Sequence, residues 1–191
     1  GDVTVGSDTN FTVNSSASTV NFDEILSFDA YQSIEDGPEH TSVNITANTD
    51  LSCSKLVTVN NKVYFTATAS NGSMTFSGLK TYEHSVIDLT SHTDMTFNKD
   101  PDNKDSHGLS YGSVYTYDGR PYSFSADAKT GAIDFEGKAS FPNPWDGIYD
   151  ITIIAENDIT FGDDVDVGEN DIFTVTATTG NIDFQKDLSL S

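Results

Sequence analysis

The chain has 191 residues and carries 30 Asp and Glu against nine Lys and Arg, a formal net charge of −21 at pH 7. Because nucleic-acid binding requires a basic surface, this balance argues against nucleic acid as a partner. The single cysteine, Cys53, excludes a disulfide framework, and no apolar run is long enough to span a membrane.

A twelve-residue pattern recurs along the chain and alternates strictly with a version that is one residue shorter. The long form reads FTVNSSASTVNF from Phe11, FTATASNGSMTF from Phe65, FSADAKTGAIDF from Phe124 and FTVTATTGNIDF from Phe173. The short form reads VNITANTDLSC from Val43, IDLTSHTDMTF from Ile87 and ITIIAENDITF from Ile151. Such repetition is typical of proteins whose units bury their apolar face only by stacking.

Each copy is expected to contain two short strands and a tight turn. In residues 173–178 apolar residues alternate with threonines, and this period-2 alternation predicts a strand. The alternation resumes after Gly180. Gly72, Gly131 and Gly180 in three long copies, and Asp50, Asp94 and Asp158 in the short ones, are residues that a tight turn favours. Alternating pairs such as Val57 and Val59, which precede the next copy, predict a third strand.

Three strands in about 22 residues predict one rung of a right-handed parallel β-solenoid (β-helix), with about seven rungs in the chain. Residues 1–191 are expected to form a single all-β domain. Stacked rungs place equivalent inward residues in ladders. The first ladder contains Phe22, Cys53, Phe76, Phe97, Phe135, Phe161 and Phe184, and the second contains Val20, Leu51, Met74, Met95, Ile133, Ile159 and Ile182. An antiparallel β-sandwich is the alternative, although it does not require the same residue type in every unit.

Loop insertions interrupt the repeat at residues 29–42, 98–121 and 138–150. All three are predicted to follow the second strand of a rung and to emerge along one edge, where solenoids often bind their ligands. Aromatic rings there could stack on sugars, and packing against the core or another loop is the alternative. The candidate ligand-binding residues are Tyr111, Tyr115, Tyr117, Trp145 and Tyr149.

A calcium ion is the only cofactor for which the sequence offers a candidate site. Ca²⁺ takes six to eight oxygen ligands, and one short segment supplies four of them. The candidate ligands are Asp100, Asp102, Asn103 and Asp105. A solvated acidic loop is the alternative. The acidic run at residues 163–166 is attributed to corner geometry, because the first rung lacks most of these acids.

No catalytic residue is predicted, and the chain is not expected to be an enzyme. Residues 108–112 (GLSYG) fit G-x-S-x-G, but that motif requires a strand, a sharp turn and a helix, and no helical pattern follows. Residues 48–50 (NTD) are similar to the Asn-Thr-Asp of β-helical polygalacturonases. The equivalent segments 92–94 (HTD) and 156–158 (END) indicate turn chemistry instead.

Four N-x-S/T sequons are candidate glycosylation sites, and their number is close to what the abundance of Asn, Ser and Thr gives by chance. They begin at Asn10, Asn14, Asn44 and Asn71.

Residues 1–28 match residues 163–190 without a gap. We therefore expect either a segment of a longer repeat protein or a subunit stacked end to end. Unpaired strand edges in an end rung favour pairing, so the expected partners are flanking repeats or other copies of the chain. Surface glycans are a further candidate partner.

Units of the form G-x-I-x-F occur at residues 131–135 and 180–184, with Met in place of Ile at 72–76. They resemble the repeats of filamentous-haemagglutinin-like adhesins and autotransporter passenger domains. They are also similar to chlamydial-type polymorphic membrane protein repeats, although the F-x-x-N half of that signature is absent. The resemblance implies a secreted β-helical stalk or adhesin, and no family site residue transfers to this chain.

We therefore expect an extracellular structural or adhesive module at the cell surface, without catalysis. The first alternative is a subunit of an extracellular filament or surface layer, assembled through its end rungs. The second is a carbohydrate-binding β-helix. The acidic, Thr- and Asn-rich composition favours the extracellular location, because excess charge keeps such a surface soluble.

Overall fold

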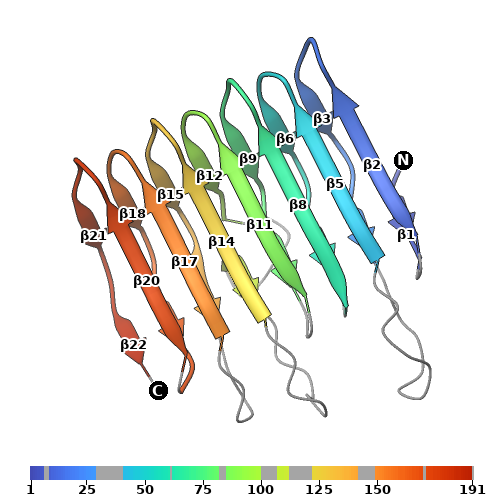
Figure 1. The fold of residues 1–191 in the computed structure, drawn as a ribbon. Helices are drawn as coiled ribbons and strands as arrows, with labels where there is room; N and C mark the ends of the chain where they lie inside the picture. Colours follow the sequence, from blue (N-terminus) through green and yellow to red (C-terminus); the bar gives the residue numbers. More distant parts are fainter. Residues whose placement is uncertain are drawn as a thin grey trace.

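A computed structural model describes residues 1–6, 9–28, 41–60, 62–81, 85–99, 107–111, 122–141, 149–169 and 171–190. Within these ranges the regular elements are all β-strands. The strands pair in parallel and form three sheets that run the length of the molecule (Figure 1). The predicted all-β parallel solenoid is therefore confirmed and the antiparallel sandwich is wrong, while the right-handed sense stays a prediction.

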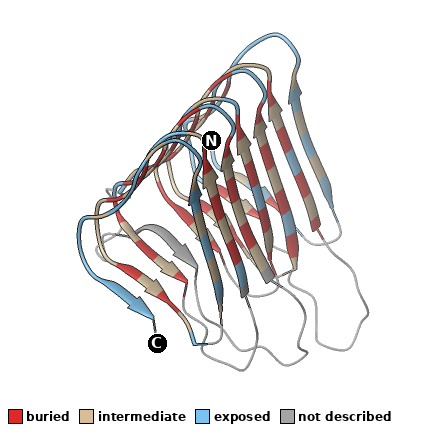
Figure 2. Ribbon diagram, turned by 60° about the vertical axis from the view of Figure 1, so that its left-hand side comes forward, coloured by how far each residue is buried: buried red, intermediate tan, exposed pale blue. Residues whose placement is uncertain are grey.

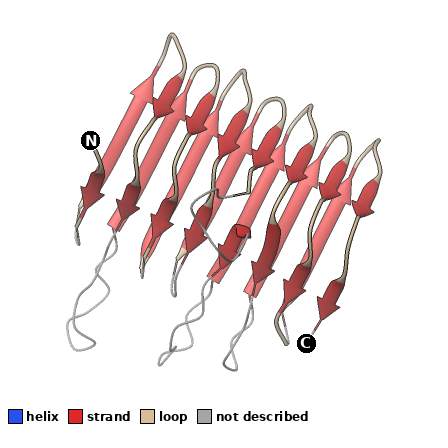
Figure 3. Cartoon of the chain, turned by 180° about the vertical axis from the view of Figure 1, so that it is seen from behind, coloured by secondary structure: helices blue, strands red, loops and turns tan. Residues whose placement is uncertain are grey.

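The chain visits the three sheets in a fixed order, so each sheet collects every third strand (Figure 3). Sheet A contains β1 (Val3–Val5), β4 (Leu26–Phe28), β7 (Val57–Val59), β10 (Leu79–Thr81), β13 (His107–Tyr111), β16 (Lys138–Phe141), β19 (Val165–Val167) and β22 (Leu188–Leu190). Sheet B contains β2 (Asn10–Ser15), β5 (Thr41–Ala47), β8 (Val63–Ala69), β11 (Val86–Ser91), β14 (Tyr122–Ala128), β17 (Tyr149–Ala155) and β20 (Ile172–Ala177). Sheet C contains β3 (Val20–Phe22), β6 (Leu51–Cys53), β9 (Met74–Phe76), β12 (Met95–Phe97), β15 (Ile133–Phe135), β18 (Ile159–Phe161) and β21 (Ile182–Phe184). From β2 to β22 the described strands form successive triplets, one for each predicted rung.

Both predicted inward ladders are present in sheet C. The register pairs Phe22 with Cys53 and continues through the five phenylalanines that follow. From Phe97 to Phe184, successive phenyl rings stack with centroids 4.7 to 4.8 Å apart and interplanar angles of 3° to 6°. Neighbouring strands are also spaced by about 4.8 Å. Each added rung therefore covers the face of the preceding ring, because the strand spacing set by backbone pairing equals the stacking distance of the rings.

Cys53 occupies a phenylalanine position in this ladder and is 1% exposed. Burial raises the pKa of its thiol to about 12. The thiol therefore stays protonated at neutral pH, where it packs as a small apolar side chain and is a poor nucleophile.

Burial alternates along the strands and fades at the two end rungs (Figure 2). In the middle of the solenoid, inward side chains such as Phe76 and Ile133 are fully buried. In the last rung the equivalent Phe184 is only partly buried and Ile182 is 42% exposed, whereas in the first rung Phe22 is partly buried and Val20 stays buried at 8% exposure. A solenoid core is therefore completed from above and below by the neighbouring rungs.

The corner between sheets B and C explains the alternation of long and short repeats. Four residues separate β8 from β9, whereas three separate β5 from β6. The extra residue shifts the corner, so the Ser73 N–H donates to Asp50 Oδ1 at 2.8 Å instead of to a backbone carbonyl. A buried or half-buried N–H needs an acceptor, and the aspartate of the short corner supplies it.

The same hydrogen bond recurs in the other two pairs of rungs. Asp94 Oδ1 accepts a bond of 2.9 Å from the Ala132 N–H, and Asp158 Oδ1 accepts one of 2.7 Å from the Asn181 N–H. The segments 48–50, 92–94 and 156–158 are therefore structural corners, as the sequence pattern indicates.

The loop insertions are placed differently from the prediction. Strand β13 lies inside the predicted insertion 98–121, and β16 begins the predicted insertion 138–150. The insertion 29–42 in turn follows β4, the third strand of its rung. The prediction that all three follow the second strand of a rung is therefore wrong for 29–42 and 138–150, and it holds only for residues 98–106, which follow β12. Strands of so few residues show too little alternation to be recognised between irregular segments. Among the long connections, 29–40, 112–121 and 142–148 run from sheet A to sheet B, and 98–106 runs from sheet C to sheet A.

Replacing Thr81 by Val is expected to raise the free energy of unfolding by about 1 kcal/mol, because a buried unpaired hydroxyl is destabilising. Thr81 is fully buried at the end of β10, and within the described ranges its Oγ1 has no hydrogen-bond partner. Ser85→Ala is the matched control, since Ser85 Oγ donates to the Asn60 carbonyl at 2.9 Å and its loss should destabilise. Urea denaturation followed by circular dichroism measures both. If Thr81→Val lost more unfolding free energy than Ser85→Ala, the conclusion that the Thr81 hydroxyl is unpaired would be wrong.

Candidate functional site

One corner of the solenoid, between sheets A and B, carries most of the irregular sequence. Twelve residues separate β4 from β5, ten separate β13 from β14 and seven separate β16 from β17. The other connections at this corner have three or four residues, and the sheet B to sheet C corner has only three or four throughout. Because insertions in a solenoid usually carry recognition, the A–B corner is the candidate binding edge.

The five candidate ligand-binding aromatics all belong to this edge. The backbone of Tyr111 ends β13, and that of Tyr149 begins β17. Tyr115 and Tyr117 fall in the connection between β13 and β14, and Trp145 falls in the connection between β16 and β17. These three positions lie outside the described residues. Sheet register places β14 beside β17, so two of the long connections enter neighbouring strands.

Tyr64 is an aromatic residue at the same edge that the sequence analysis missed. It precedes Phe65 in β8, so it takes the outward phase of the strand, and it is 42% exposed. Its register partner in the next rung is Val86. The signal was available in the alternation, because a large residue directly before an inward Phe must face outward.

The described backbone at this edge is fixed by specific contacts. Thr41 is fully buried, and its Oγ1 lies 3.4 Å from the Gly6 carbonyl. Ser85 Oγ donates to the Asn60 carbonyl at 2.9 Å. Lys62 takes a left-handed conformation with φ of 58°, which few residues other than Gly adopt. The start of β5, where the connection 29–40 ends, and the short connections of this corner are thus fixed by specific contacts.

The four candidate calcium ligands, Asp100, Asp102, Asn103 and Asp105, fall between β12 and β13 and lie outside the described residues. The calcium site stays a prediction. In the part of the chain that the structure describes, no group of three or more His, Cys, Asp or Glu side chains could hold a metal ion.

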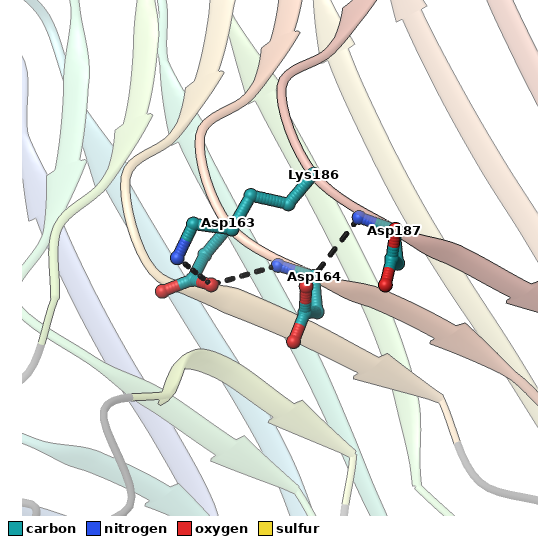
Figure 4. Close-up of polar contacts among 4 residues, drawn as sticks. All are labelled: Asp163, Asp164, Lys186 and Asp187. Atoms are coloured by element: carbon teal, nitrogen blue, oxygen red, sulfur yellow. Dashed lines mark hydrogen bonds and ion pairs between the residues drawn. The ribbon is translucent and has the colours of Figure 1, made fainter.

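The acidic run at residues 163–166 serves the fold, as the corner interpretation predicts (Figure 4). Asp163 Oδ1 accepts a hydrogen bond of 2.9 Å from the Asp164 N–H and a bond of 2.8 Å from Lys186 Nζ. Asp164 Oδ1 accepts from the Asp187 N–H of the next rung at 3.4 Å. Asp166 forms an ion pair with Lys138. Each carboxylate therefore has a role within the solenoid.

Lys186→Met is expected to raise the pKa of Asp163. The hydrogen bond from Lys186 is the main reason that this pKa lies below its usual value, and the Asp164 N–H adds to the effect. Since the pKa is lowered in the folded state, ionised Asp163 stabilises the fold at neutral pH. That contribution is lost as the pH falls through the folded pKa. The variant should therefore lose less stability on acidification than the parent chain, by a small amount for a surface pair.

Titration of the Asp163 carboxyl by NMR measures this shift. Lys129→Met is the control, because Lys129 pairs with Asp127 elsewhere on the surface and should leave Asp163 unchanged. An unchanged pKa of Asp163 in Lys186→Met would show that the pair does not persist in solution.

The G-x-S-x-G segment does not have the geometry of a nucleophile turn. The backbone of Ser110 lies inside β13, paired with Lys80 on one side and Ser140 on the other. A nucleophile of this motif sits on a sharp turn between a strand and a helix. The described part of the segment is instead an extended strand within a sheet.

The four sequons lie on the outer surface. Asn10, Asn14 and Asn44 are exposed outward residues of sheet B. Asn71 lies in an exposed corner, where its Nδ2 donates to Asn48 Oδ1 at 3.1 Å. Among the four sequon asparagines, Asn71 is the one that lies outside a strand, so its backbone is the most accessible.

The described residues include no helix long and apolar enough to cross a membrane. No family model, curated protein or solved structure matches this chain.

Proposed function

We propose that this chain is an extracellular structural and adhesive module in which the solenoid is a rigid spacer and the A–B corner carries recognition. The observation that carries the proposal is the contrast between the corners. Every sheet B to sheet C corner keeps three or four residues, whereas the A–B corner admits connections of up to twelve. A regular scaffold with variable loops on one edge is the arrangement that binding solenoids use.

The interior of the solenoid supports the spacer role. Three continuous parallel sheets and a stack of phenyl rings connect successive rungs. Catalysis is not part of the proposal, because the acidic corner residues Asp50, Asp94 and Asp158 are engaged by backbone N–H groups of the next rung.

A surface glycan is the ligand class that the edge favours. Its connections carry Tyr115, Tyr117 and Trp145, and Tyr64 adds an exposed ring on β8. Aromatic faces pack on the apolar faces of sugars, while carboxylates accept hydrogen bonds from hydroxyls. The net charge of −21 makes polyanionic glycans unsuitable, so neutral glycans are the proposed class.

Binding to an array of neutral glycans tests the adhesive role. The triple variant Tyr115→Ala, Tyr117→Ala and Trp145→Ala should lose binding and keep the melting temperature of the parent chain. The control variant is Thr96→Ala with Thr160→Ala, since both residues face outward on sheet C, away from the edge. Equal binding by the triple variant and the parent would overturn the role of the edge.

The extracellular location has a separate test. An antibody against the chain should label intact source cells, and added protease should remove the label without cell lysis. Labelling that requires permeabilised cells would overturn the location and leave the binding edge to be judged on its own.

A further inference from the structure

Asn71 and Gly72 form the one Asn-Gly pair in the sequence, and they lie in the long corner between β8 and β9. Asparagine is a chemically labile residue. Its side-chain amide is open to attack by the backbone nitrogen of the residue that follows, and glycine has no side chain to obstruct that attack. Asn71 is exposed to solvent, and among the described residues the Gly72 N–H donates to no backbone carbonyl. The pair therefore combines a reactive amide with a backbone nitrogen that no carbonyl holds.

The stacking of the corners requires the glycine of this pair. An added Cβ at Gly72 would lie 2.4 Å from Asp50 Oδ1 and 2.6 Å from the carbonyl carbon of Thr49. Gly131 and Gly180 have comparably close contacts in their own corners, but the residue before each of them is a threonine. The labile pair therefore arises because this corner places an asparagine before a glycine that the fold needs.

Hydrogen bonds to the two neighbouring rungs restrain the pair. Asn71 Nδ2 donates to Asn48 Oδ1 at 3.1 Å, and the Asn71 N–H donates to the Asn48 carbonyl at 2.9 Å. On the other side, the Gly72 carbonyl accepts from the N–H groups of His92 and Thr93 at 3.1 Å each. Attack on the amide requires the Asn71 side chain to turn toward the Gly72 nitrogen, so the bond from Nδ2 to Asn48 has to break first.

We propose that Asn71 is a site of spontaneous deamidation and that its hydrogen bond to Asn48 slows the reaction in the folded chain. In this reaction the Gly72 nitrogen bonds to Asn71 Cγ, and the Cγ–Nδ2 bond breaks. The amide nitrogen leaves as ammonia with the proton of the Gly72 N–H. Water then opens the cyclic imide to give aspartate or isoaspartate. The site lies at the end of sheet B opposite to the candidate binding edge, so it does not depend on the adhesive role.

Both products are expected to weaken the corner. Aspartate replaces the donor Nδ2 by an oxygen opposite Asn48 Oδ1, and it adds a negative charge to a corner that already holds Asp50. Isoaspartate lengthens the backbone by one methylene group next to Gly72, where the two corners are already in close contact. The conversion should therefore lower the melting temperature, and isoaspartate should lower it more than aspartate does.

Mass spectrometry of peptides from the chain, kept at mildly alkaline pH, measures the conversion. The chain is produced without N-glycans, because a sugar on Asn71 Nδ2 would occupy the same atom. Asn71 should convert more slowly in the folded chain than in the chain unfolded in urea. Asn48→Ala should raise the rate in the folded chain about fivefold, which corresponds to one hydrogen bond of about 1 kcal/mol. Asn48→Asp keeps an oxygen acceptor and should convert at nearly the rate of the parent chain.

Asn71→Thr is the matched variant, because Thr130 and Thr179 hold the same corner position and donate to carbonyls of the preceding rung. After the same incubation it should keep its melting temperature, while that of the parent chain falls. An Asn71 amide that persists in the folded parent would overturn the deamidation site. Conversion as fast in the folded parent as in urea would overturn the restraint. Equal rates in the parent and in Asn48→Ala, with unchanged circular dichroism, would overturn the role of Asn48.

Discussion

Replacing Gly131 by Ala is expected to lower the free energy of unfolding by about 3 kcal/mol. The added Cβ would lie 2.3 Å from the carbonyl carbon of Thr93 and 2.5 Å from the Asp94 nitrogen. These backbone atoms cannot withdraw easily, because Met95, which follows them, is paired in sheet C on both sides. Overpacking of this kind costs about 1 to 3 kcal/mol, and a clash with backbone belongs at the upper end. Urea denaturation followed by circular dichroism measures the loss.

Two further variants separate the backbone clash from the nearby carboxylate. Asp94 Oδ1 also lies 2.6 Å from the added Cβ, so Asp94→Ala removes that contact and leaves the backbone contact in place. We expect Asp94→Ala to fail to rescue Gly131→Ala. Gly6→Ala should be almost neutral, because nothing lies within 4 Å of its added Cβ. Rescue by Asp94→Ala would show that the corner is held apart by the side chain alone.

The sequence was sufficient to predict the core because solenoid stacking turns a sequence period directly into contacts. The alternation around Phe173 and the recurrence of Phe at the end of each copy gave the strands, the sheet C register and the phenyl ladder. Every rung repeats the same local interactions, so a strand that is hard to predict in one rung can be placed from the equivalent strands of the others.

The sequence did not reveal why long and short rungs alternate. That reason is a hydrogen bond between rungs, from the Ser73 N–H to Asp50, and a close approach between the corners. Both depend on the stacking offset of two corners that are 23 residues apart in the chain, and no local pattern shows that offset.

The sequence predicted which aromatic residues belong to the candidate binding edge, but it placed them after the wrong strands. The aromatic residues were assigned to insertions after the second strand, whereas Tyr111 and Tyr149 belong to strands that flank the A–B corner. Strands such as β13 and β16 have too few residues to show a period between irregular segments. Their place comes from pairing with β10 and β19, which is a tertiary effect.

Replacing Phe135 by Ala is expected to lower the free energy of unfolding by about 4 kcal/mol. The Phe135 ring is fully buried and stacks on Phe97 at 4.7 Å and on Phe161 at 4.8 Å. Truncation of a buried phenylalanine leaves a cavity and costs about 3 to 5 kcal/mol. The rungs above and below are held by continuous sheets, so the cavity cannot close by a shift of one strand.

Phe22→Ala and Phe135→Leu show how much of this loss comes from burial and how much from stacking. Phe22 has the same place in the first rung but is only partly buried, so its truncation should cost clearly less. Phe135→Leu keeps most of the volume, and swaps of this kind cost less than about 1.5 kcal/mol. If Phe135→Leu lost nearly as much unfolding free energy as Phe135→Ala, ring stacking would be the main contribution. If Phe22→Ala and Phe135→Ala lost the same amount, the core would not be completed by the neighbouring rungs. Since the ladder already accepts Cys53 in one rung, we expect filled volume to matter more than an unbroken stack of rings.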